Sequence, residues 1–228
     1  MGKSIPVGFL CLLFAWPLAA SDTPPVTPQL YVQVWLGGQS TDDGSWEIPD
    51  PAGGQNVLGD LGTLPFGGGA GQLFWGSGAW QIGYEGGALV TWKNDRTEFR
   101  GTNGTVQVVI DNTFVSAGVF MGGVVSVVPV RPLRLYVAAG PSVTWAWLQN
   151  DNDDQAAPPP GSNTNTINGD ANDVSVVPYA RAGIEIVLHD GFTFGLSVRY
   201  ADDEFQFDDA GDLKFDQVLW LLTLGSRL

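Results

Sequence analysis

Apolar and polar residues alternate along the last stretch of the chain. Alternate side chains of a strand point to opposite faces, so this stretch predicts a strand with one apolar face and one small or polar face. A strand at this place needs partners on both edges, and a closed barrel provides them. The apolar face carries Val218, Trp220, Leu222, Leu224 and Leu228, with Ser226 as its one polar member.

The same alternation recurs in seven earlier segments. The predicted strands are 30–36, 69–76, 80–92, 114–127, 133–147, 174–188 and 192–200, followed by the last strand. Segments rich in Gly, Pro, Asn and Asp separate them, as is typical of turns and loops. Short connections at 76–78, 129–132 and 189–191 alternate with long ones at 38–68, 93–112, 149–173 and 202–216. Within the second long connection, the apolar run 106–110 predicts a strand extension as an alternative to a loop.

This order of connections predicts the fold class. Outer-membrane barrels have short periplasmic turns, long outer loops and an even number of strands. We therefore expect an all-β, eight-stranded, antiparallel up-and-down transmembrane β-barrel. Nearly all acidic residues fall in the long connections. The only charged residues of the short connections are Arg131 and Asp190. Pro141 and Pro178 interrupt predicted strands and lack a backbone donor, so we expect a bulge or local irregularity at each.

The first twenty residues predict a secretory signal peptide. Lys3 precedes an apolar segment at 5–18, and small residues end at Ala20. Residues 1–20 are then the signal peptide, 21–28 a Pro-rich linker and 29–228 the barrel domain. Cys11 is the only cysteine and lies inside the signal peptide, so we expect no disulfide in the mature chain.

Three segments carry a resemblance to a known family. The last strand and the segments Tyr136–Pro141 and Gly195–Tyr200 resemble those of small outer-membrane β-barrels, the OmpA-like and opacity-type eight-stranded proteins. Members usually end in Phe or Trp, where this chain has Leu228. The resemblance implies a multi-pass protein of the bacterial outer membrane. Its expected partners are the lipids of that membrane and, during insertion, the barrel-assembly machinery.

Charged residues occupy the face opposite the predicted lipid face. They are Glu85, Arg181 and Arg199 at mid-barrel height, with Arg134, Glu185 and Arg227 nearer the periplasm. An eight-stranded barrel is just wide enough for side chains to fill, and an unpaired buried charge costs several kcal/mol. The pattern therefore favours a paired structural plug over an ion-conducting pore.

Tryptophans lie near the predicted strand ends at positions 80, 92, 145 and 147. Trp concentrates at membrane interfaces, where one part of the ring is apolar and another is wet. We expect an interfacial role for these four side chains rather than an enzymatic or sugar-binding one.

The sequence offers little for catalysis. Barrel enzymes such as lipid A deacylases and palmitoyltransferases use a His with Ser or acidic partners near the outer rim, because the nucleophile needs a base within reach. His189 is the only histidine and lies in a predicted periplasmic turn. We expect a protein that is not an enzyme and needs no cofactor, with a hydrolase that uses only carboxylates as an open alternative.

Oxygen ligands cluster in two of the long connections. Asp151 and Asp153, and Asp208 and Asp212, have a spacing that suits a hard cation such as calcium. Neither cluster matches the twelve-residue calcium loop. A solvated anionic surface is the favoured interpretation, and we predict no metal site.

Charge and patterning together limit the function. The formal net charge of -14 argues against nucleic acid as a partner. We expect a non-enzymatic surface barrel whose long acidic loops have a structural role or contact an unknown extracellular partner. The alternatives are a narrow ion or small-solute channel and a soluble lipocalin-like barrel. The lipocalin-like barrel would bury its apolar face around a ligand and leave Glu85, Arg181 and Arg199 outside.

Overall fold

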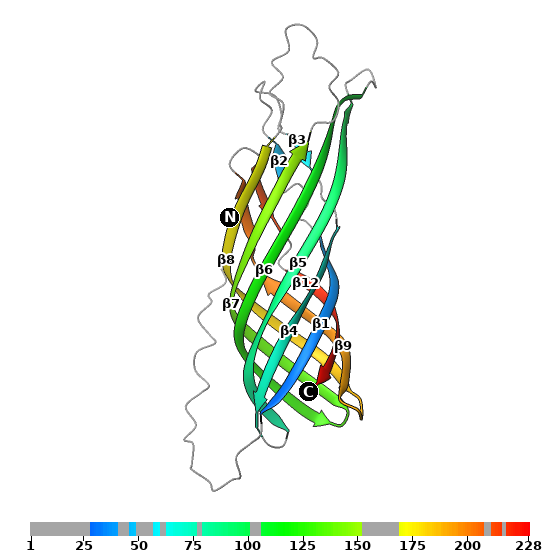
Figure 1. Ribbon diagram of the computed structural model, residues 1–228, viewed down its shortest axis with the longest axis vertical. Helices are drawn as coiled ribbons and strands as arrows, with labels where there is room; N and C mark the ends of the chain where they lie inside the picture. The colour runs from blue at the N-terminus through cyan, green and yellow to red at the C-terminus, as the bar shows by residue number, and fades with distance from the viewer. Residues whose placement is uncertain are drawn as a thin grey trace, which may run out of the picture.

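Eight long strands close into an antiparallel barrel (Figure 1). The computed structural model describes residues 28–40, 46–48, 57–59, 63–76, 79–100, 106–151, 169–207, 211–215 and 218–228, so the predicted signal peptide lies outside the described residues. The barrel strands are β1 (Gln29–Ser40), β4 (Thr63–Trp75), β5 (Trp80–Arg100), β6 (Val106–Val130), β7 (Leu133–Asp151), β8 (Gly169–Val187), β9 (Phe192–Ala201) and β12 (Val218–Arg227). Two short sheets pair β2 (Trp46–Ile48) with β3 (Val57–Gly59), and β10 (Glu204–Phe207) with β11 (Gly211–Lys214). The predicted fold class and strand number are confirmed.

The pairing of β1 with β12 closes the sheet. Their register runs from Tyr31 opposite Arg227 to Gly38 opposite Trp220, and the Leu228 amide donates to the Leu30 carbonyl at 2.9 Å. Every barrel strand therefore has a partner on each side. Such closure is required in a bilayer, where no water is available to satisfy the backbone at a free edge.

The outer face of the barrel is apolar and exposed. In the described part of each barrel strand, every second side chain points outward. Val34, Tyr84 and Leu222 are examples, and they are 57%, 68% and 55% exposed. Side chains of the opposite parity on the same strands, including Gln33, Glu85 and Thr223, are buried in the interior. An apolar surface that surrounds a barrel is stable only in lipid. The soluble lipocalin-like alternative is therefore wrong.

Four adjacent strands extend well beyond the rest of the barrel at one end (Figure 1). The β5–β6 ladder continues to Arg100 opposite Val106, and the β7–β8 ladder continues to Asn150 opposite Gly169. The parts of 93–112 and 149–173 predicted as loops are thus partly strand, and the alternative extension at 106–110 is the correct one. Regular apolar alternation ends before the strands do: residues 93–98 and 149–151 are polar and 106–110 is largely apolar without strict alternation, yet backbone pairing continues through all three.

The two strand prolines do not produce bulges. Pro141 lies directly opposite Pro178 in the β7–β8 register, which continues unchanged on both sides of this pair. The β8–β9 ladder begins at Tyr179 opposite Ala201, so Pro178 has no β9 partner that requires its missing donor. On the other side, the β6–β7 ladder omits two pairs near Pro141 without a change of register. The expectation of a bulge is wrong for both prolines, whereas the two missing pairs beside Pro141 are a local irregularity of the kind predicted there.

Glycines inside the barrel make room for large aromatic side chains. A Cβ atom at Gly183 would overlap the Tyr136 ring, and one at Gly122 would lie 2.7 Å from the Tyr179 hydroxyl. The absence of a side chain at these glycines leaves the space that the Tyr136 ring and the Tyr179 hydroxyl occupy. Part of the interior is filled in this way, next to the charged residues described below.

Candidate functional site

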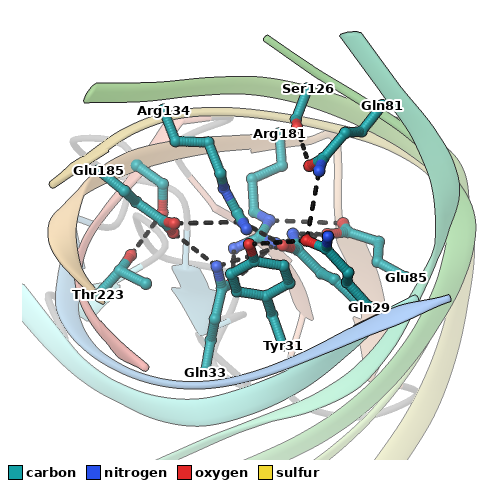
Figure 2. A network of polar contacts seen from close by, with 12 residues as sticks. Gln29, Tyr31, Gln33, Gln81, Glu85, Ser126, Arg134, Arg181, Glu185 and Thr223 are labelled. Atoms are coloured by element: carbon teal, nitrogen blue, oxygen red, sulfur yellow. Dashed lines mark hydrogen bonds and ion pairs between the residues drawn. The ribbon is translucent and has the colours of Figure 1, made fainter. Parts of the chain in front are cut away.

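An ion pair between Glu85 of β5 and Arg181 of β8 lies at the centre of the interior (Figure 2). Both side chains are fully buried. Glu85 also accepts hydrogen bonds from the Tyr179 hydroxyl at 2.9 Å and from Gln72 Nε2 at 2.8 Å. Its two carboxylate oxygens thus accept from three side chains, two on β8 and one on β4, which compensates for much of the cost of burying a carboxylate.

A second ion pair lies beside the first, nearer the short turns. Arg134 Nη2 of β7 is 3.1 Å from Glu185 Oε2 of β8, and both side chains are fully buried. Gln33 connects the two pairs, because its carbonyl accepts from both Arg181 Nη atoms at 3.2 Å while its Nε2 donates to Glu185. Gln72 makes a similar link, since its carbonyl accepts from Arg134 Nη2 at 2.6 Å. The two pairs form a single cross-barrel network.

Aromatic faces surround both guanidinium groups. The Arg134 guanidinium lies 4.2 Å from the ring centroid of Tyr31 and 5.1 Å from that of Phe74. The Arg181 guanidinium lies 4.6 Å from Trp35 and 4.8 Å from Tyr136. A cation over an aromatic face is stabilised by the ring quadrupole, more strongly when water is excluded. The network is therefore packed laterally as well as hydrogen bonded.

A third pair lies toward the outer end of the barrel. Arg199 Nη2 donates to Ser142 Oγ at 2.8 Å, and Arg199 Nη1 is 3.9 Å from Asp203 Oδ2. Asp203 lies beyond the outer end of β9, where burial raises the pKa of its carboxyl and the Arg199 guanidinium opposes that shift. Sequence reasoning missed Asp203, because it lies in a segment predicted as an acidic loop. The signal in the sequence that could have identified Asp203 as a partner of Arg199 was its position four residues later.

The three pairs balance one another in charge. Arg134, Arg181 and Arg199 stand against Glu85, Glu185 and Asp203. The structure thus brings together five of the six residues that the sequence analysis placed in the interior. Arg227 is the exception: it is the last residue of β12 and is exposed at the mouth of the barrel. Its predicted place in the network is wrong, because the sheet ends there and leaves the side chain in water.

The outer half of the interior is apolar and aromatic. Phe205 and Phe207 of β10, Leu213 of β11 and the adjacent Phe215 are all buried, in one cluster with side chains of the barrel wall. The Phe215 ring lies 5.5 Å from Phe205 and 5.5 Å from Phe114 of β6, edge to face in both cases. We call residues 204–215 the inner hairpin, because its phenylalanines point into the barrel. Wall residues that share the cluster include Trp35, Leu64, Phe120, Leu148, Tyr179, Leu219 and Leu221.

Polar contacts fix the inner hairpin to the barrel wall. The Gln206 amide donates to Asp173 Oδ2 of β8 at 2.7 Å, and the Phe215 amide donates to the Asp203 carbonyl at 3.3 Å. The prediction of a plain acidic loop at 202–216 is wrong for this part. Phenylalanine and leucine alternate there with acidic residues, which is itself a strand signal that the high acidic content concealed.

The remaining candidates are located as follows. Trp80, Trp92 and Trp145 are exposed on the outer face and Trp147 is half-buried, whereas Trp35 is buried in the interior. His189 is exposed in the short turn between β8 and β9. Asp151 ends β7 and Asp212 lies in β11, whereas Asp153 and Asp208 lie outside the described residues. In the part of the chain that the structure describes, no group of three or more His, Cys, Asp or Glu side chains could hold a metal ion. The same residues include no helix that is long and apolar enough to cross a membrane.

A closed eight-stranded barrel with an apolar exterior and side chains across its interior is typical of one class of membrane protein. The protein is a small bacterial outer-membrane β-barrel, with the short turns at the periplasmic end and the long connections outside.

Solved structures agree with this class. The outer membrane protein OprG from Pseudomonas aeruginosa has a TM-score of 0.50 at 11% identity, over 90% of this chain and 97% of OprG. Ail, the attachment invasion locus protein of Yersinia pestis, in complex with the heparin analogue sucrose octasulfate, has a TM-score of 0.49 at 14% identity, over 88% of this chain and 98% of Ail. At such identities the similarity concerns the fold alone. No protein-family model and no curated protein sequence matches the chain.

The central ion pair generates a stability prediction. In the E85Q variant, Arg181 would remain buried without its counter-charge, so we expect a loss of about 3–5 kcal/mol in the free energy of unfolding. The double variant E85Q/R181M removes both charges and should recover most of that loss. Urea unfolding of the barrel in lipid vesicles measures both values. The control is R131Q in an exposed turn, which should change stability by less than about 0.5 kcal/mol. An E85Q variant as stable as R131Q would contradict the importance of the pair.

Proposed function

We propose that this protein is a non-enzymatic outer-membrane barrel that holds an extracellular platform in place. The filled interior is the observation that supports this proposal most directly. Two ion pairs occupy the periplasmic and middle parts, a third lies toward the outer end, and the phenylalanines of the inner hairpin pack into the outer part. Solute passage would require both layers to move, which makes a channel the weaker hypothesis.

The outer end of the barrel provides the platform. Strands β5 to β8 extend as a tall wall, while β1, β9 and β12 end lower on the opposite side (Figure 1). The inner hairpin lies against β8, and its strand β11 lies against β2 of the short β2–β3 sheet. Elements from the first and last long connections therefore meet over the lower side of the barrel, where they offer a folded surface to a partner.

The charge of the chain indicates which partners this platform favours. A formal net charge of -14 and the concentration of acids in the long connections favour basic or neutral partners. Ail has been solved with a polysulfated ligand, and a ligand of that kind would be repelled here. We therefore propose an extracellular partner with a cationic surface.

A conductance measurement tests the filled interior. Planar bilayers that contain the purified full-length protein should show no steady current above that of lipid alone, because we expect the ion pairs and the phenylalanines to block a continuous aqueous path. The E85A variant serves as the comparison, because it removes the carboxylate of the central ion pair and so enlarges the space beside Arg181. Steady single-channel currents from the unmodified protein that change in E85A would overturn the proposal in favour of a narrow channel.

A binding measurement tests the sign of the partner's charge. The barrel in lipid nanodiscs should bind immobilised polylysine and not immobilised heparin, and raising the salt concentration from 50 to 500 mM should weaken the binding, because screening acts on exposed charges. Empty nanodiscs of the same lipid are the control. Preferential binding to heparin would contradict a partner with a cationic surface.

A further inference from the structure

One polar residue interrupts the apolar outer face near the periplasmic end. Ser226 of β12 lies between Val32 of β1 and Phe192 of β9 in the register of the sheet. Along its own strand the next outward residues are Leu224 and Leu228. A small side chain with four large apolar neighbours leaves a depression in the surface.

That depression is part of a shallow groove in the outer face. It has a volume of about 760 Å³, and its lining is almost entirely apolar. Leucine, valine and phenylalanine side chains form its walls, whereas Ser226 and Gly225 supply its floor. The Ser226 hydroxyl donates to the backbone carbonyl of Arg227 at 3.4 Å, which turns its polar hydrogen toward the chain itself. The wall residues are Val32, Val34, Leu188, Phe192, Phe194, Leu224 and Leu228.

The residues of the groove nearest the periplasm show where it lies in the membrane. Leu188 precedes the periplasmic turn between β8 and β9, and Leu228 follows the end of β12. From Leu228 to Leu224 the strand is about 14 Å long, at roughly 3.4 Å per residue, which at a strand tilt of about 40° corresponds to roughly 10 Å along the bilayer normal. Half of the hydrocarbon core of a bilayer is about 15 Å thick. The groove therefore covers most of the depth of the inner, periplasmic leaflet.

We propose that this groove binds one acyl chain of a phospholipid from the periplasmic leaflet. The argument rests on continuity, because the groove is part of the apolar outer face that already contacts lipid. Val32, Val34 and Leu224 line the groove and are 41%, 57% and 50% exposed, so no other part of the described chain covers them. A flexible hydrocarbon chain can follow a narrow apolar depression between strands, and its burial against the walls is favourable.

The periplasmic rim of the groove supplies a charge for the lipid headgroup. Arg227 is exposed and lies between Ser226 and Leu228 along the chain. Its side chain has the inward parity, opposite to that of Ser226, but Arg227 belongs to the last pair of the sheet, where its long stem allows the guanidinium to reach a phosphate at the level where the headgroup of a chain bound in the groove would lie. An anionic phospholipid, with net charge beyond its phosphate, should therefore bind more tightly than a zwitterionic one.

Native mass spectrometry of the detergent-solubilised full-length protein tests the acyl-chain site. The probe is palmitoyl-oleoyl phosphatidylglycerol, added at increasing concentration. The unmodified protein should retain one lipid per barrel in a saturable manner, whereas S226L, which fills the floor of the groove, should bind about tenfold more weakly. A180L is the matched control, because it enlarges another outward residue away from the groove and should bind as the unmodified protein does.

Folding of each variant is checked by the shift between unheated and boiled samples on an SDS gel. If S226L does not fold, S226V provides a milder filling of the same floor. Equal lipid retention in S226L and the unmodified protein, or no retention in either, would overturn the proposal. A dimer of barrels that disappears in S226L would assign the groove to a second copy of the chain, and would likewise overturn it. The proposed role of Arg227 in headgroup binding is tested separately by R227Q. An R227Q variant that still prefers phosphatidylglycerol to phosphatidylethanolamine would contradict that role.

Discussion

The structure depends on the requirement that every backbone hydrogen bond be satisfied in lipid. A strand edge left open in a bilayer has no water to bind, so the sheet must close, and the pairing of β1 with β12 closes it. Closure with eight strands fixes a narrow interior that side chains must fill. Any charge inside must then have a partner. The pairing of Glu85 with Arg181 and of Glu185 with Arg134 follows from this chain of constraints.

The interior is filled in two chemically different ways. The periplasmic and middle parts contain a neutral set of ion pairs joined by the amides of Gln33 and Gln72. The outer part contains phenylalanines, several of which come from the inner hairpin rather than from the wall. Arg199 and Asp203 lie toward this outer part and link the end of β9 to the start of the hairpin. The barrel is therefore continuous with the elements above it, which supports a role for the outer surface.

Much of the fold could be predicted from the sequence, because lipid imposes a strict alternation on membrane strands. That alternation located the strands, separated the outward residues from the inward ones, and placed Glu85 and Arg181 inside. It failed where lipid no longer acts. The backbone pairing of β5 to β8 continues past the last residues with regular apolar alternation, and Arg227 has the inward parity but is exposed. The inner hairpin was missed because its acidic residues suggested a solvated loop. No bulge forms at Pro178 because the β9 ladder begins just beyond it, and the place where a neighbouring strand ends cannot be read from the sequence.

The accessibility of the interior to water-soluble reagents tests the central claim most directly. Ser197 lies in β9, is 2% exposed and shares a hydrogen bond with Thr223 of the neighbouring strand β12, on the inner face of the barrel. A mature chain without Cys11 contains no cysteine, so S197C introduces a single thiol. With the folded protein in vesicles, a membrane-impermeant thiol reagent should leave this cysteine unmodified from either side and should react with it fully after unfolding. Rapid modification in the folded barrel would contradict a filled interior and indicate an open aqueous path.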